Sequence, residues 1–360
     1  MRRWWLKDII LLIIGLAVLV GANYVLQVMP IQGMAYYFRI IILIGISITL
    51  AVSLNIINGH AGQFSLGHAG FMAIGAYLSA FVTYFYASPY LEKLPEGSNK
   101  IILQNVFFLG AVIFGGICAA IAGYLVGLPS LRLRGDYLAI VTLGFGEIIR
   151  VVFLNVEKLG GARGLSGVPA WSNFIWVYFF AWMTVLVSMR LVKSSIGRAF
   201  LAVREDEIAA EAMGVDTTRY KVQAFVIGSF FAGVAGGLYG HYLAYLNPAM
   251  FTFMKSFEVI TMVVLGGLGS ISGSILAAII LTFLPEGLRM AKEFLHSNSD
   301  PRMVIYSIML IALMLTRPQG LLGRRELWEV LARRKDTIPK DTRDKGEEKM
   351  DRTSGPSIGE

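Results

Sequence analysis

The sequence predicts an all-α membrane protein, a polytopic transmembrane helical bundle with about 9–10 membrane segments. Apolar residues make up 56% of the 360-residue chain and charged residues only 16%, whereas a typical soluble domain has about 25% charged residues. The apolar residues gather in blocks of about 20, the length that a helix needs to cross the hydrocarbon core of a bilayer. A helix also satisfies its own backbone hydrogen bonds in lipid, and these blocks are too long and too uniformly apolar for barrel strands.

The apolar spans follow one another along most of the chain. Their predicted bounds are 9–28, 38–57, 69–87, 103–128, 138–155, 174–192, 222–245, 257–284 and 303–316. The first span follows Arg2, Arg3 and Lys7, as a signal peptide would, but no small-residue cleavage site follows it and the apolar run continues to Val28. We therefore interpret it as a retained first helix.

Lys and Arg lie mostly in the segments between the spans, where such residues set the orientation of a membrane protein. Their distribution predicts that both termini and the segment 193–220 are cytoplasmic, and it explains the net charge of +8 without a nucleic-acid partner. The clusters comprise Arg2, Arg3, Lys7, Arg132, Arg134, Arg190, Lys193, Arg198, Arg204, Arg219, Lys221, Arg317, Arg324, Arg325, Arg333 and Arg334.

Nine single crossings cannot leave both termini on one side of the membrane, so one block must contain a break. The block 257–284 is the best candidate, because glycines and serines between Gly266 and Gly273 interrupt its middle. Broken backbone at membrane depth is tolerated only where protein or a water-filled cavity surrounds it. We expect two short segments there, re-entrant or broken, that line the interior of the bundle.

Three regions of the chain differ in composition. Residues 1–322 form the predicted transmembrane domain, which includes the hydrophilic segment 193–220. In 323–335, basic residues alternate with apolar ones, a pattern typical of an amphipathic helix that lies on the membrane face. Residues 336–360 are charged and poor in apolar residues, which predicts a disordered cytoplasmic tail.

A glycine-rich polar segment from Asn58 to Gly70 separates two apolar spans. Unwound backbone in a transport protein exposes groups that bind a solute, and small residues also allow helices to pack closely. The segment is therefore either a lining of a translocation path or a tight cytoplasmic turn. His60 and His68 have no carboxylate or cysteine beside them in this stretch, so no metal site is predicted. The residues assigned to the path are Gln63, Ser65, Gly67, Gly266, Gly267, Gly269 and Ser270.

A short helix is predicted in the cytoplasmic segment, from Glu205 to Met213. This stretch lacks Gly and Pro, is rich in Ala and Glu, and stops at Gly214, as a helix with a C-terminal glycine does. Ile208 and Ala212 would share one face, and charged residues flank it. A small exposed helix with an apolar stripe suits docking into a groove on a partner. A solvated loop helix that binds nothing is the alternative.

Four segments, in the same order, resemble one known family. They read NGHAGQFSLG from residue 58, SLRLRGDYLA from 130, REDEIAAEAMG from 204 and VLGGLGS from 264. In these segments the chain resembles the membrane-spanning permease subunits of ABC importers for branched-chain amino acids, and more narrowly the longer of the two permease subunits. The resemblance extends over residues 38–322.

The resemblance implies a multi-pass protein of a prokaryotic inner membrane that forms half of a heterodimer with a second permease subunit. Two cytoplasmic ATPase subunits would hydrolyse ATP, and an extracytoplasmic solute-binding protein would deliver the substrate. The helix near 207–214 would then be the coupling helix, although Ile208 stands where the motif usually has an acidic residue, Glu207 is displaced by one, and no Leu-Pro pair follows. The residues that this implies for coupling are Arg204, Glu205, Glu207, Ala209, Ala210, Glu211 and Gly214.

Other classes of function have less support. The chain lacks a G-x-x-x-x-G-K-[ST] phosphate loop, so we expect partner subunits to hydrolyse the ATP and this chain to bind no cofactor. No catalytic triad or paired-carboxylate site indicates an enzyme. An ion-coupled secondary transporter is the alternative, with Glu147, Arg150 and Glu258 as its candidate intramembrane charges. We interpret Glu147 and Arg150 instead as a helix-end pair near an interface, and Glu258 as reaching the interface beside Lys255. The pattern does not separate branched-chain amino acids from related small amino acids or amides.

Overall fold

The computed structural model describes residues 34–95, 97–130 and 136–295, together with 308, 311, 320–323 and 326. The predicted first helix at 9–28 and the tail at 336–360 lie outside the described residues. The spans 303–316 and 323–335 lie almost entirely outside them. The chain divides into two compact units after Arg324, and all but one of the described residues belong to the first.

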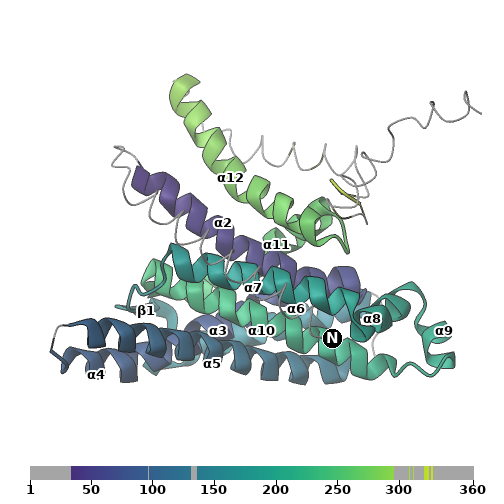
Figure 1. Cartoon of the computed structure of the whole chain (residues 1–360), viewed down its shortest axis with the longest axis horizontal. Coiled ribbons are helices and arrows are strands. Elements are labelled where there is room, and N and C mark those ends of the chain that lie inside the picture. Colours follow the sequence, from purple (N-terminus) through teal and green to yellow (C-terminus); the bar gives the residue numbers. More distant parts are fainter. Residues whose placement is uncertain are drawn as a thin grey trace, which may run out of the picture. The chain divides into compact units, whose positions relative to one another are not determined.

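Helices form almost all of the described structure (Figure 1). They are α2 (Met34–Asn55) with the π-helical turn η1 (Ile56–His60), α3 (His68–Val82) with η2 (Thr83–Ala87) and α4 (Ser88–Glu92), α5 (Ser98–Ser130), α6 (Asp136–Asn155), α7 (Phe174–Lys193), α8 (Ser195–Glu205), α9 (Glu207–Ala212), α10 (Thr217–Leu243), α11 (Phe253–Gly266) and α12 (Ile271–Leu295). Short elements connect them: η3 (Glu157–Leu159), η4 (Gly161–Arg163), β1 (Leu165–Ser166), β2 (Tyr245–Leu246) and η5 (Pro248–Phe251).

Seven helices within the described ranges are long and apolar enough to cross a membrane. Six of them correspond to the predicted spans from 38–57 to 222–245, and the seventh, Pro248–Gly266, overlaps only the first part of the predicted block 257–284. The prediction of an all-α polytopic bundle is therefore confirmed. The physical basis is length and composition, because each span has 19 or more residues and few charges.

The bundle has two distinguishable ends. At one end, β1 follows α6 and β2 follows α10, and the two strands pair antiparallel with Leu165 opposite Leu246. At the other end, α8 and α9 connect α7 to α10 (Figure 1). We call these the β end and the α8–α9 end. The segment that is predicted to be cytoplasmic therefore gathers at a single end of the bundle.

Helix α10 lies at the centre of the bundle and packs against α3 and α5. Glycines allow this close packing: a Cβ atom added at Gly75 would lie 2.0 Å from the carbonyl oxygen of Gly233, and one at Gly236 would lie 1.9 Å from that of Met72. Small residues let membrane helices approach until their backbones touch, which maximises dispersion contacts. In contrast, α6 is only 22% buried within this chain, so it lies at the periphery.

The block 257–284 contains the predicted break. Helix α11 ends at Gly266, α12 begins at Ile271, and the turn between them includes Gly267 with φ +110°. Side chains rarely adopt this backbone conformation, so glycine is required at that position. The expectation of two short segments is wrong for α12, which has 25 residues.

Candidate functional site

The segment 61–67 runs back into the bundle beside the end of α2. The amide of Ser65 donates to Asn58 Oδ1 at 3.2 Å, and His68 Nε2 lies 2.9 Å from Ser53 Oγ. Ser53 lies about two helical turns before His60, so α3 begins well inside the bundle and not at its end. This irregular backbone is surrounded by protein, which is the condition under which it is stable at membrane depth.

The predicted path residues of this segment are mostly covered by the chain itself. Gln63 and Ser65 are buried, while Phe64 between them is 40% exposed. Ser65 Oγ has no hydrogen-bond partner among the described residues. Gly67 packs directly on α6, because a Cβ atom there would lie 2.2 Å from the Thr142 carbonyl oxygen.

The glycine turn between α11 and α12 is fastened to the end of α2 by Asn55. The amide of Gly269 donates to Asn55 Oδ1 at 2.9 Å, and Asn55 Nδ2 donates to the Ser270 carbonyl at 3.0 Å. Asn55 is fully buried. It is not among the residues predicted from the sequence, although a lone amide inside an apolar span is a usable signal, since a buried amide needs hydrogen-bond partners.

A described part of the C-terminal region, residues 320–323, covers the same turn. The amide of Leu321 donates to the Leu265 carbonyl at 2.7 Å, and that of Leu322 donates to the Gly266 carbonyl at 3.3 Å. These bonds satisfy carbonyl groups at the end of α11, which the helix itself leaves without partners. The turn is therefore held from two sides, by α2 and by this segment.

Arg204 of α8 lies between the segment 193–220 and both unwound segments. Its Nη1 donates to the Gly59 carbonyl at 2.7 Å, and its side chain is only 17% exposed. Its Nη2 donates to Glu205 Oε1 at 2.9 Å. Arg204 therefore points into the bundle, unlike a side chain that is presented to a partner.

Helix α9 protrudes at the α8–α9 end. Asp206 caps its N-terminus by accepting from the amides of Ile208 and Ala209 at 2.9 and 3.0 Å. After its C-terminal end comes Gly214, whose φ of +83° suits glycine. Ile208 is 66% exposed and Met213 is 84% exposed. Of the other predicted coupling residues, Ala209, Glu211 and Gly214 are exposed, whereas Ala210 is buried.

Glu207 faces the bundle, because its Oε2 lies 2.6 Å from Nζ of Lys221 on α10. The side chain of Lys221 is 5% exposed, so this pair is largely shielded from solvent and screened little by salt. From the sequence alone, Lys221 served only as an orientation signal, and this pairing was not predicted. The pair fastens α9 to α10 and leaves Ile208 of α9 exposed.

Glu147 and Arg150 form an ion pair in the middle of α6, with Arg150 Nε 2.6 Å from Glu147 Oε2. Glu147 occupies the twelfth position of the 20-residue helix, so the interpretation as a helix-end pair is wrong. Their side chains are 35% and 26% exposed in this chain. Glu258 pairs with Lys255 Nζ at 2.9 Å near the start of α11.

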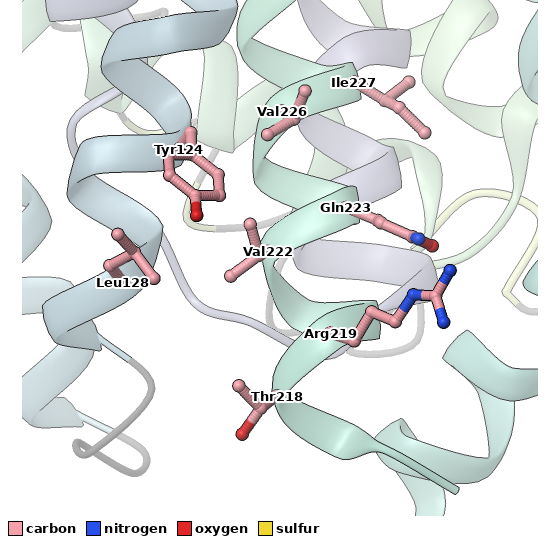
Figure 2. A pocket seen from close by; sticks show the side chains of 8 residues that line it. All are labelled: Tyr124, Leu128, Thr218, Arg219, Val222, Gln223, Val226 and Ile227. Atoms are coloured by element: carbon pink, nitrogen blue, oxygen red, sulfur yellow. The ribbon is translucent and has the colours of Figure 1, made fainter.

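A shallow groove of about 390 Å³ lies between the end of α5 and the start of α10 (Figure 2). Its lining comprises Tyr124, Leu128, Thr218, Arg219, Val222, Gln223, Val226 and Ile227. The groove brings no carboxylate to its lining, and an ammonium group would need one. Its lining includes none of the predicted path or coupling residues, so it adds nothing to the candidate site. Among the described residues, no cluster of His, Cys, Asp and Glu is arranged to hold a metal ion.

Comparison with known proteins places these features in context. Residues 36–314 match the family described as branched-chain amino acid transport system / permease component. The chain is 37% identical over 312 residues to the high-affinity branched-chain amino acid transport system permease protein LivM of Escherichia coli (strain K12), which covers 77% of this chain and 68% of LivM. It is 34% identical over 304 residues to the permease protein LivH of the same organism, covering 78% of this chain and 92% of LivH. No solved structure gives a significant match.

Proposed function

Since this chain belongs to the family of branched-chain amino acid transport permeases, we propose that it forms half of the translocation path of an ABC importer and carries the movement of ATPase subunits into the membrane. Similarity to both LivM and LivH indicates an importer with a pair of permease subunits. The proposed partners are a second permease subunit, two cytoplasmic ATPase subunits and an extracytoplasmic solute-binding protein. The proposed location is a prokaryotic inner membrane.

The observation that carries the coupling role is the exposure of two large apolar side chains at α9. Ile208 on α9 and Met213 directly after its end are both exposed, and α9 is capped at its start and ion-paired to α10 through Glu207. A rigid small helix that presents apolar side chains to water gains free energy when a groove on a partner covers them. We assign this groove to an ATPase subunit.

The proposed mechanism is alternating access driven by the partners. ATP binding closes the two ATPase subunits, which displaces the groove around α9. The membrane helices then reorient and expose the path to the other side. Hydrolysis and release restore the first state, and this chain binds no ATP or other cofactor itself.

The proposed substrates are branched-chain amino acids or related small amino acids and amides. A branched-chain amino acid is a zwitterion with an apolar side chain, and the solute-binding protein would make much of the selection. Gln63, Ser65, Gly67 and the 266–270 turn remain proposed parts of the path. Since Gln63 and Ser65 are buried in this chain, they would reach a solute only after the segment 61–67 moves.

The test uses the complete complex in lipid nanodiscs and measures ATP hydrolysis with and without substrate-loaded binding protein. Ile208→Asp with Met213→Asp places carboxylates in the docking face and leaves the Glu207–Lys221 pair intact. We expect the ATPase subunits to dissociate or stimulated hydrolysis to disappear.

The matched control is Arg198→Glu, a charge change at an exposed position of the α8–α9 end that should leave hydrolysis unchanged. Native stimulation in the α9 variant would rule out the coupling role. Transport by the membrane subunits without any ATPase would favour an ion-coupled carrier instead.

A further inference from the structure

We propose that Arg204 is the positioning residue that passes movement of α8–α9 to both unwound segments of the membrane bundle. The proposal rests on the proposed docking of α9 and goes beyond it by naming the connection inside this chain. Three contacts carry it: with the end of α2, with the α11–α12 turn, and with α9 itself.

The first contact holds the end of α2. Gly59 is next to last in η1, and its carbonyl accepts from Arg204 Nη1 at 2.7 Å. The last carbonyls of a helix have no partners within the helix and carry partial negative charge, so a guanidinium stabilises them. Directly after this point, residues 61–67 lead into the start of α3. A displacement of Arg204 therefore acts on the segment that positions α3.

The second contact holds the turn between α11 and α12. A Cβ atom on Gly269 would lie 2.7 Å from Arg204 Nη1, and one on Gly59 would lie 2.4 Å from the Gly269 amide. Gly62 also packs against the side chain of Arg204, since a Cβ atom on Gly62 would lie 2.6 Å from Arg204 Cγ. Asn55 also links α2 to this turn by two hydrogen bonds. Arg204 therefore packs closely against the turn, and a displacement of its guanidinium would act on the turn through these contacts.

The third contact connects Arg204 to α9 without a flexible linker. Arg204 is next to last in α8, and only Asp206 separates the two helices. Asp206 is fixed because its carboxylate caps α9. Helix α8 is itself anchored by the buried Phe200, which packs in one cluster with Ile56 and Ala61. A force on α9 is therefore transmitted to the guanidinium through short, packed steps.

Arginine suits this role better than lysine. Its planar fork donates in two directions at once, here from Nη1 to Gly59 and from Nη2 to Glu205. Lysine keeps the positive charge but lacks the fork. If Arg204 only balanced charge, lysine would replace it fully; if it positions two segments, lysine would replace it in part.

The test compares Arg204→Met, Arg204→Lys and the control Arg198→Met in the complete complex. Arg198 lies on the same helix but is exposed, so it matches the change without touching the membrane segments. Three quantities are measured in proteoliposomes: the amount of ATPase subunits retained, the rate of ATP hydrolysis, and solute transported per ATP. Thermal unfolding in detergent monitors the fold.

We expect Arg204→Met to retain the ATPase subunits and hydrolysis while transport per ATP falls about tenfold or more, as the loss of a hydrogen bond from a charged donor predicts. Solute transported per ATP should fall several-fold in Arg204→Lys, and in Arg198→Met it should equal that of the native chain. A native ratio of transport to ATP in Arg204→Met would overturn the proposal. Dissociation of the ATPase subunits in that variant would also overturn it, because Arg204 would then be a docking residue.

If Arg204→Met fails to fold, Arg204→Lys decides: full transport per ATP with lysine would contradict the positioning role. These outcomes are distinct from failure of the α9 docking role, which the Ile208→Asp with Met213→Asp variant tests independently.

Discussion

At the scale of single residues, the charges inside this bundle are held by partners at short range. Glu147 and Arg150 approach to 2.6 Å in the middle of α6, and Glu207 and Lys221 approach to 2.6 Å beside the start of α10. A charge that loses its partner in a membrane protein is exposed to a medium that solvates it poorly. Each partner is therefore required by the other.

Removing one charge of the α6 pair should destabilise the protein. Glu147→Gln leaves Arg150 as a lone cation at mid-span, for which we expect a loss of about 3 kcal/mol, the cost of an arginine at a helix centre. Thermal unfolding in detergent and the yield of folded protein measure it. The exchanged pair, Glu147→Arg with Arg150→Glu, should recover much of the loss. Native stability of Glu147→Gln would show that the pair faces water.

At the scale of elements, glycines decide how closely the helices pack. In the apolar stretch of α10, 72% of the residues are buried. Its backbone at Gly233 lies directly against the backbone of α3 at Gly75. Without water in the hydrocarbon core, this packing replaces the hydrophobic effect as the main attraction between helices. Side-chain volume at these positions therefore controls stability.

Adding one methyl group at this contact should be costly. Gly75→Ala would place a Cβ atom 2.0 Å from the Gly233 carbonyl oxygen, so we expect a loss of about 1–3 kcal/mol from overpacking. Gly110→Ala on α5 is the matched control, because nothing lies within 4 Å of its added Cβ. Thermal unfolding compares the two variants. If both variants were equally stable, the contact between α3 and α10 would tolerate the added methyl group without a loss of stability.

At the scale of the whole molecule, the described bundle has an incomplete side. Helix α6 is only 22% buried in this chain, and it carries a partly exposed ion pair at mid-span together with exposed Ile148 and Val151. Charged groups in a membrane face protein or water and avoid lipid. We therefore predict that the second permease subunit of the proposed importer packs against α6 and covers the Glu147–Arg150 pair.

A cross-linking experiment tests this placement. Val151 lies one turn from Glu147, so Val151→Cys in a chain with Cys118→Ala should cross-link to the second permease subunit. Ile121→Cys on α5 is the control, since Ile121 is 56% exposed on a helix without a mid-span ion pair. Cross-linking is read from gel mobility with a short bifunctional reagent. Cross-links from Ile121→Cys alone would move the interface to α5.

The sequence by itself determined the class of the protein, its spans and the position of the break. Spans are set by length and apolar composition, which are local properties, and six of the seven described spans agree with the predicted ones. The break before Gly267 follows from its positive φ, which glycine provides. The position of helix α9 was predicted in the same way, from its composition and from the glycine after its C-terminal end.

Only the tertiary structure decided which residues of these segments meet. Asn55, Arg204 and Gly269 are far apart in the chain, and no spacing rule links them, yet they share one site. The inward direction of Glu207 required the position of Lys221 on α10, and the depth of Glu147 required the true bounds of α6. Long-range contacts of this kind depend on how whole helices pack, because a hydrogen bond or ion pair is specified by two partners and a single segment contains only one of them.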